Sequence, residues 1–271
     1  PIHGGKIRVD GSVSSQFITG LLLALPMAEE DTTLYVDSAV STPYIDMTID
    51  TAQRFGVEIM HNEGDYSEFF IEGRQEYTPT DISIEGDWSG ASTMLVAGAI
   101  AGEVTVMNIS TLSRQADTAI CRALERAGAG IVIEHGSITV SKRPLKAFTF
   151  DATNCPDLFP ALAALAAAAE GESTIIGTNR LMHKESDRAE TIRREYEKLG
   201  ISVDISEDNI MKIQGGKILP ATVFSHNDHR IAMSLAVSAL RCEGTVTIEN
   251  AECVEKSYPE FFEDLESIIR R

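Results

Sequence analysis

The sequence predicts an α/β protein built from four successive copies of one strand-and-helix unit, with parallel helices buried and sheets on the solvent side. Three observations support this prediction. Similar segments recur along the chain, each opens on an apolar helix, and glycines recur near the ends of the more charged helices. Recurrence of one layout at a steady period indicates a repeat architecture.

The first helix of each copy is rich in Ala and Leu. Each follows a polar turn, ends at acidic residues or a glycine, and is followed by a strand rich in β-branched residues. The four segments begin at Gly11, Gly86, Asn154 and His226. The aspartates of the last three turns, Asp87, Asp157 and Asp228, stand 70 and 71 positions apart, and Ser14 or its neighbours hold the equivalent place in the first. A helix that is apolar on most sides, such as 160–169, has to be covered by other elements.

The second helix of each copy is more charged and ends near a glycine. We expect Gly56, Gly130 and Gly200 to be C-caps, because a residue without Cβ adopts the left-handed conformation at little cost. An alternating strand and a second strand, such as SITVS or IMKIQ, follow each glycine as in a hairpin. The unit is therefore predicted to be βαβαββ. The fourth copy stops after its second helix, so we expect chain preceding Pro1 to complete it.

Composition restricts the possible partners. With a net charge of −18, the chain is not expected to bind nucleic acid or an anionic membrane surface. The longest apolar stretches, 160–169 and 94–101, fall short of the roughly 18 residues of a membrane-spanning helix. The four cysteines show no CxxC spacing, which favours reduced thiols and a cytoplasmic location over a disulfide framework or a zinc site.

The turn GSVSSQF, from Gly11 to Phe17, has two interpretations. Free N–H groups and the dipole at a helix start favour a phosphate or carboxylate, and Ser14, Ser15 and Gln16 add donors. Ordinary N-capping by Ser12 or Ser14 explains the same residues equally well.

The segment HKESDR, from His183 to Arg188, opens the second helix of the third copy. Lys184 and Arg188 are expected on one helical face, four residues apart, where two cations are favourable if an anion lies between them. A solvated helix start, in which Glu185 and Asp187 complement the dipole, is the alternative.

Two further turns carry charged residues before apolar helices. In HNDHR the cation Arg230 lies at a helix start, and the pair His226 and His229 has no third ligand cluster to support a zinc site. In NCPDLFP we expect burial beside an apolar helix to raise the basicity of Asp157, as a general base requires, although capping is the simpler interpretation.

Cations recur at the strand-to-helix turns. Lys184, Arg188, Arg230 and Lys256 all occupy such turns, and equivalent turns of a repeat lie on the same face of the molecule. A cationic cluster on an acidic protein indicates an anionic ligand.

These motifs resemble one known family. The ordered series GSVSSQF, STPYIDMT, EGDWSGAS, PDLFPALA, HKESDR, NDHRIAM and EKSYPEFF resembles the EPSP synthases (3-phosphoshikimate 1-carboxyvinyltransferases) across essentially the whole chain. The resemblance implies the two-domain enolpyruvyl transferase fold, an inside-out α/β barrel, with an active site in the interdomain cleft. Residues 1–84 would finish the shikimate 3-phosphate-binding domain, and residues 85–271 would form most of the second domain.

The resemblance also implies roles. Ser14, Ser15, Gln16, Ser41 and Tyr44 would bind shikimate 3-phosphate, as would Lys184. Asp157 would accept the proton of the attacking 5-hydroxyl, and Glu185 would move a proton at the phosphoenolpyruvate methylene. Gln16, Arg188, Arg230 and Lys256 would bind phosphoenolpyruvate. No metal or cofactor is implied, and a monomeric full-length enzyme is expected.

The family's N-terminal third has no counterpart here, so we expect weak or no turnover from these 271 residues alone. The sister transferase acting on UDP-N-acetylglucosamine is an alternative, disfavoured by KESDR, NDHR and KSYPEFF. A noncatalytic piece that binds phosphorylated ligands is another. A sliding clamp is a third alternative. It is disfavoured because a clamp would place its cations along helices that face DNA, whereas the cations of this chain lie in turns.

Overall fold

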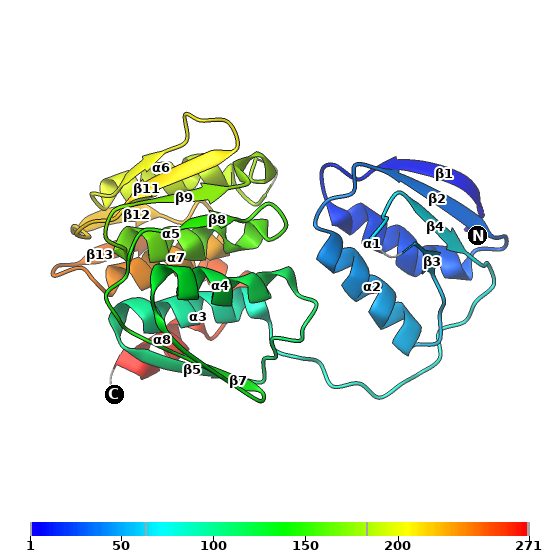
Figure 1. Ribbon diagram of the computed structural model, residues 1–271, viewed down its shortest axis with the longest axis horizontal. Coiled ribbons are helices and arrows are strands. Elements are labelled where there is room, and N and C mark those ends of the chain that lie inside the picture. The colour runs from blue at the N-terminus through cyan, green and yellow to red at the C-terminus, as the bar shows by residue number, and fades with distance from the viewer. Residues whose placement is uncertain (1, 63, 183, 270–271) are drawn as a thin grey trace. The chain divides into compact units, whose positions relative to one another are not determined.

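The computed structural model describes residues 2–62, 64–182 and 184–269. The chain forms two compact units (Figure 1). Unit 1 comprises residues 1–84 with 114–116, and unit 2 comprises 85–113 with 117–271. Assignment of these units to the two domains of the family stays a prediction.

Unit 1 contains one complete βαβαββ copy. Its elements are β1 (Gly5–Asp10), α1 (Ser15–Ala24), β2 (Thr32–Asp37), α2 (Thr42–Arg54), β3 (Met60–His61) and β4 (Glu68–Ile71), with a 3₁₀ turn at Leu25–Met27. The sheet order is β1-β2-β4-β3; β1 and β2 are parallel, and the other neighbours are antiparallel.

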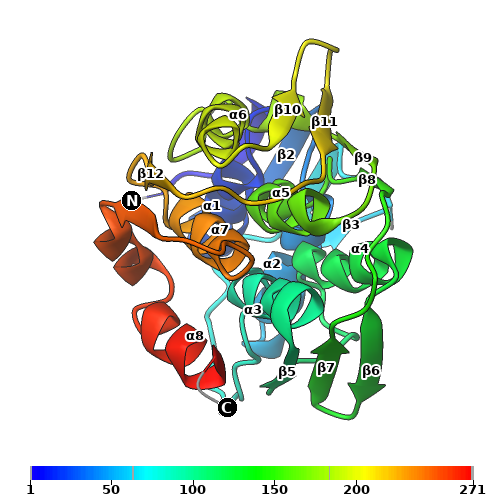
Figure 2. The ribbon, with the colours of Figure 1, turned by 90° about the vertical axis from the view of Figure 1, so that its left-hand side faces the viewer.

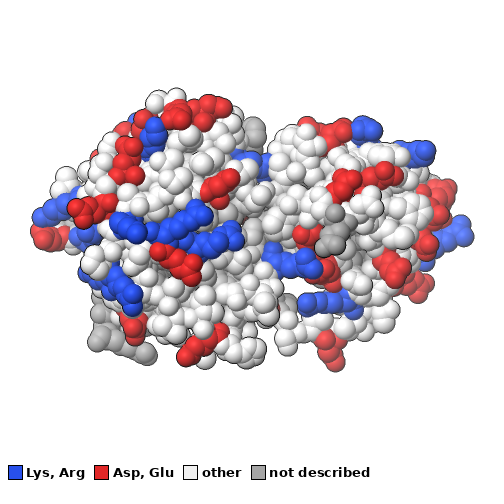
Figure 3. All heavy atoms as spheres, in the orientation of Figure 1, with Lys and Arg blue, Asp and Glu red and all other residues white. Residues whose placement is uncertain are grey.

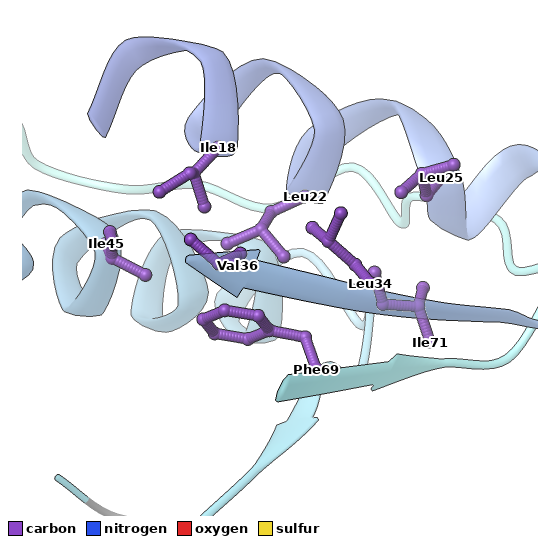
Figure 4. Packing of buried hydrophobic residues seen from close by; sticks show 8 residues of the cluster. All are labelled: Ile18, Leu22, Leu25, Leu34, Val36, Ile45, Phe69 and Ile71. Atoms are coloured by element: carbon purple, nitrogen blue, oxygen red, sulfur yellow. The ribbon is translucent and has the colours of Figure 1, made fainter. Parts of the chain in front are cut away.

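The core of unit 1 forms where the helices cover one face of this sheet (Figure 4). Alternate residues of β2 and β4 point to that face, as the two-residue period of a strand requires. Eight side chains make the cluster: Ile18, Leu22, Leu25, Leu34, Val36, Ile45, Phe69 and Ile71.

Unit 2 contains the remaining copies. The second includes α3 (Trp88–Ala101), β5 (Glu103–Met107), α4 (Ile120–Ala127), β6 (Gly130–Glu134) and β7 (Ser137–Ser141). The third includes β8 (Thr149–Asp151), α5 (Phe159–Ala168), β9 (Glu172–Ile176), α6 (Arg188–Lys198), β10 (Ser202–Asp204) and β11 (Ile210–Gln214). The fourth includes β12 (Ala221–Phe224), α7 (His229–Ala239), β13 (Val246–Glu249) and α8 (Phe261–Ile269). Short 3₁₀ turns lie at Ala116–Ala119, Pro156–Leu158, Thr178–Arg180 and Ala251–Lys256.

The sheets confirm the predicted repeat. The third copy has the order β8-β9-β11-β10, the same topology as unit 1, with its first pair parallel and the others antiparallel. The second copy has β5-β7-β6 and lacks a strand before α3 in the described chain, and the fourth has only the parallel pair β12 and β13.

The first helices of the three copies in unit 2 form its interior. Helices α3, α5 and α7 pack against one another, and Figure 2 shows them side by side with strands outside. Nearly every residue of α3, α5 and α7 is buried, which agrees with the prediction that helices apolar on all sides lie inside. Across the described residues, no helix is long and apolar enough to cross a membrane.

The predicted glycine caps are correct at two of three positions. Gly56 (φ 82°) and Gly200 (φ 81°) are left-handed after α2 and α6, but the left-handed residue after α4 is Gly128 (φ 89°), so the prediction for Gly130 was wrong. Gly130 begins β6 instead, where a Cβ would collide with Ser141 of β7. The three left-handed glycines stand 72 positions apart.

Candidate active site

In unit 1, the predicted ligand residues lie at the starts of α1 and α2. Ser14 is the N-cap of α1, where its Oγ accepts a hydrogen bond from Gln16 N at 3.2 Å, so the capping interpretation is confirmed. Ser15 is buried in the first turn and Gln16 is exposed. Both helix starts offer N–H groups that suit an anion, but a ligand role for these residues stays a prediction.

Ser41 and Tyr44 lie at the start of α2. Ser41 is buried and left-handed (φ 52°) at the N-cap position, and Tyr44 N donates to Ser41 O at 3.0 Å. One turn further into the two helices, Thr19 Oγ1 and Thr48 Oγ1 form a hydrogen bond at 2.9 Å. This contact aligns the two helices, so their first turns lie at the same end of unit 1.

In unit 2, three predicted cations converge on Asp157. Its Oδ1 lies 3.2 Å from Lys184 Nζ, 2.8 Å from Arg188 Nη1 and 3.7 Å from Arg230 Nε. These side chains come from the turn before α6, the first residue of α6 and the first turn of α7. The expected convergence of cations is therefore present for these three residues.

Asp157 is placed for this role by the turn that precedes α5. It lies in the 3₁₀ turn Pro156–Leu158, and α5 begins at Phe159 with no side-chain cap, so the carboxylate faces the cations instead of capping the helix. Burial alone would raise the pKa of Asp157, but Arg230, Lys184 and Arg188 lower it well below its usual value. The expectation that burial raises its basicity was wrong because the charges outweigh desolvation.

Arg188 is fully buried inside a group of carboxylates. Its Nε donates to Asp228 Oδ2 at 3.0 Å, its Nη2 to Glu185 Oε2 at 2.6 Å and its Nη1 to Asp157. Burial opposes the charged form, but Asp228 and Asp157 raise the pKa of Arg188. Three carboxylates and three cations thus balance within the cluster, and an arriving anion must compete with the internal carboxylates for the cations.

The predicted helical face of Lys184 and Arg188 is incorrect. Helix α6 begins at Arg188, and Asp187 is its N-cap, accepting from Glu190 N at 3.3 Å. Lys184 therefore precedes the helix and reaches Asp157 from a turn. His183, which opens this motif, lies outside the described residues.

Asp228 links the last two copies. It caps α7 by accepting from Arg230 N at 3.0 Å, and it is fully buried. The same carboxylate accepts from Ser186 Oγ at 3.1 Å and from Arg188. Lys256 also contacts this turn, since its Nζ donates to Asn227 O at 2.6 Å.

Sequence reasoning missed Asp117. This buried side chain accepts a short hydrogen bond from Ser89 Oγ in the first turn of α3, and its Oδ1 has no hydrogen-bond partner in the described chain. Burial, followed by the charge of Asp157, raises the pKa of Asp117 to about 6. A single aspartate in a polar segment gives no periodic signal from which this burial could be predicted.

The two histidines of HNDHR have separate environments. His226 Nε2 lies 2.9 Å from Glu195 Oε1, whereas His229 Nδ1 is buried without a hydrogen-bond partner among residues described here. Burial lowers the pKa of His229. Three possible metal ligands come together in the described residues only at the exposed His3, Glu29 and Glu30, so neither histidine belongs to a candidate metal centre.

The fold and this site together define a class: an α/β protein of βαβαββ repeats with a cationic cluster at helix starts, suited to a small anionic ligand. Comparison with known proteins is more specific. The family model described as EPSP synthase (3-phosphoshikimate 1-carboxyvinyltransferase) matches residues 1–265. The chain therefore belongs to the EPSP synthase family.

Individual relatives support the same family assignment. The 3-phosphoshikimate 1-carboxyvinyltransferase of Clostridium perfringens (strain ATCC 13124) is 40% identical over 270 residues, which cover 98% of this chain and 63% of that protein. The enzyme of the same name from Methanosarcina acetivorans is 41% identical over 273 residues, with the same coverage. This chain thus spans less than two thirds of the length of these relatives.

Solved structures share the fold. An EPSP synthase from Acinetobacter baumannii matches with a TM-score of 0.81 and 28% identity over 98% of this chain and 62% of that one. The enolpyruvyl transferase NikO from Streptomyces tendae matches with a TM-score of 0.73 at 19% identity, over 97% of this chain and 63% of that one, a likeness of fold alone.

Proposed function

We propose that the natural protein containing this chain transfers the enolpyruvyl group of phosphoenolpyruvate to the 5-hydroxyl of shikimate 3-phosphate and releases phosphate, a step of aromatic amino acid biosynthesis. The observation that carries this proposal is the convergence of Lys184, Arg188 and Arg230 on Asp157, in a chain of the EPSP synthase family. Small anions carrying phosphate and carboxylate groups suit such a cluster.

The proposed roles follow the family resemblance. Arg188, Arg230 and Lys256 would bind phosphoenolpyruvate together with Gln16. Lys184 would bind shikimate 3-phosphate together with the polar residues at the two helix starts of unit 1, Ser14, Ser15, Ser41 and Tyr44.

The reaction proceeds by addition and elimination. Asp157 accepts the proton of the 5-hydroxyl as its oxygen bonds to C2 of phosphoenolpyruvate, and Glu185 delivers a proton to the methylene carbon. The resulting tetrahedral intermediate then loses phosphate from C2, and the Glu185 carboxylate takes back a proton from the methyl group, which restores the double bond. The cations stabilise the charge that develops on the phosphate.

Phosphate release tests the reaction. The natural protein should liberate phosphate from phosphoenolpyruvate only when shikimate 3-phosphate is added. Release that depended instead on UDP-N-acetylglucosamine would replace this proposal with the sister activity. No release with either acceptor would leave a protein that only binds phosphorylated ligands.

Asp157→Ala tests the proposed base. We expect kcat to fall by about 10²-fold or more, the usual contribution of a positioned acid or base, while substrate binding weakens little. Steady-state kinetics on the natural protein measure both quantities. An unchanged kcat would remove Asp157 as the proton acceptor.

For the whole protein, we further propose that it is a monomer and that it is located in the cytoplasm.

A further inference from the structure

The turn between β12 and α7 has an unusual backbone. His226 (φ 54°) and Asn227 (φ 58°) are consecutive left-handed residues, and neither is glycine. His and Asn tolerate this conformation better than most residues, but two in succession need support from their surroundings. The turn carries two groups of the candidate site: the Asn227 carbonyl, which accepts from Lys256, and Asp228, which binds Arg188.

A buried carboxylate contacts the residues that lead into this turn. Glu195 of α6 has no exposed side-chain surface, and its two oxygens accept from Phe224 N at 2.8 Å and from Lys198 Nζ at 2.7 and 2.9 Å. His226 Nε2 lies 2.9 Å from Glu195 Oε1. Burial opposes ionisation of Glu195, but the hydrogen bonds from His226 and Lys198 lower its pKa, so it is an ionised acceptor and Nε2 must donate.

The imidazole is also held by packing. Its ring lies edge-on to the Phe224 ring, with the centroids 5.0 Å apart. Its remaining exposed surface lines a hollow of about 440 Å³ together with Ser186, which precedes α6, and Thr191 in its first turn. The side chain is thus fixed on one side and open to solvent on the other.

Helix α6 connects this contact to the cations. Arg188 begins α6 and Glu195 follows seven residues later, so the two side chains lie on the same face of one rigid element. Arg188 binds Asp228 at the start of α7, and Glu195 binds His226 two residues earlier. Helix α6 therefore contacts the turn at two points, through Arg188 and through Glu195.

We propose that His226 is a positioning residue for the anion site. Its hydrogen bond to Glu195 keeps residues 226 and 227 left-handed, and this presents Asp228 to Arg188 and the Asn227 carbonyl to Lys256. This inference rests on the proposed function, since it concerns the binding of phosphoenolpyruvate by these cations.

Two substitutions separate the hydrogen bond from the backbone. His226→Asn keeps a residue that tolerates the left-handed conformation but is too short to reach Glu195. His226→Gln places an amide donor near the position of Nε2. Lys198→Met is the matched control, because it removes another donor of Glu195 without touching the turn.

Kinetics and phosphoenolpyruvate binding on the natural protein give the main readout. We expect His226→Asn to raise the KM for phosphoenolpyruvate by about tenfold, the equivalent of one hydrogen bond to a charged group, with kcat changed little. His226→Gln should restore most of the loss, and Lys198→Met should leave KM unchanged. An unchanged KM in His226→Asn, or an equal rise in Lys198→Met, would overturn the proposal.

The structure of the variant completes the test. A crystal structure of His226→Asn should show the turn relaxed and the contact between Arg188 and Asp228 altered, while circular dichroism checks that the variant is folded. A turn retained unaltered would refute the positioning role even if KM changed. If the unmodified protein shows no turnover with shikimate 3-phosphate, the proposed function fails, whereas the crystal structure of the variant still reports on the positioning.

Discussion

At the scale of single residues, the candidate site of unit 2 is a balance of buried charges. Arg188 has no exposed surface, and removing any one of its carboxylates would leave part of a charge without compensation. Asp117 is the exception, because it lies in the same unit as these charges but pairs with the neutral Ser89. Its protonation state therefore depends on pH in a range that experiments can reach.

Asp117→Asn tests this dependence. Because the pKa of Asp117 in the folded protein is raised from 3.8 to about 6, its protonated form adds stability that is fully present below pH 4 and lost as pH rises through 6. Asparagine cannot ionise, so the free energy of unfolding of the variant relative to the original chain should increase by roughly 2 kcal/mol between pH 4 and pH 7. Urea unfolding across this range measures it. A flat difference for Asp117→Asn would contradict the raised pKa.

At the scale of elements, the repeat could be predicted from sequence more readily than the contacts of its turns. Helix α5 is apolar on every side, and that pattern alone required an interior position. The gathering of Lys184, Arg188 and Arg230 followed from equivalent turns sharing one face, but their convergence on Asp157 was not predicted. The separate start of α6, which leaves Lys184 in a turn, and the pairing of His226 with Glu195 depend on tertiary packing, for which one sequence gives no local pattern.

Replacing two helical glycines by Ala should change the stability of the fold in opposite directions. In α3, a Cβ at Gly98 would lie 2.6 Å from Val140 O and 3.1 Å from Val104 N, so the helix approaches β5 and β7 closely. Gly98→Ala should destabilise by about 1–3 kcal/mol despite the better helix propensity. Gly20 in α1 has no atoms within 4 Å of such a Cβ, and Gly20→Ala should stabilise by roughly 0.5–1 kcal/mol. Thermal unfolding measures both, and equal signs would contradict this packing.

At the scale of the whole molecule, charge and cores are distributed over two units. Acidic and basic side chains appear on both, and Lys and Arg gather in a band across the face of unit 2 seen in Figure 3. Each unit has its own core, formed in unit 1 by residues such as Leu22 and in unit 2 by residues such as Leu162. Units with separate cores tend to unfold as separate cooperative transitions.

Calorimetry of the chain should therefore resolve two transitions. Leu22→Ala should lower the midpoint of one and Leu162→Ala that of the other, because each removes a fully buried side chain at a cost of about 2–5 kcal/mol. A single transition displaced equally by both substitutions would show that the units unfold together.

The contact of Asp157 with three cations has a consequence for the order of events in the proposed reaction. While the site holds no substrate, the cations keep this carboxylate ionised even in acid and make it a poor proton acceptor. In the proposed reaction, an anionic substrate that draws Arg188, Arg230 and Lys184 to itself would weaken these contacts, so the affinity of Asp157 for a proton would rise when the substrate binds. As the proposed proton acceptor, Asp157 would therefore become effective only after the substrate has bound.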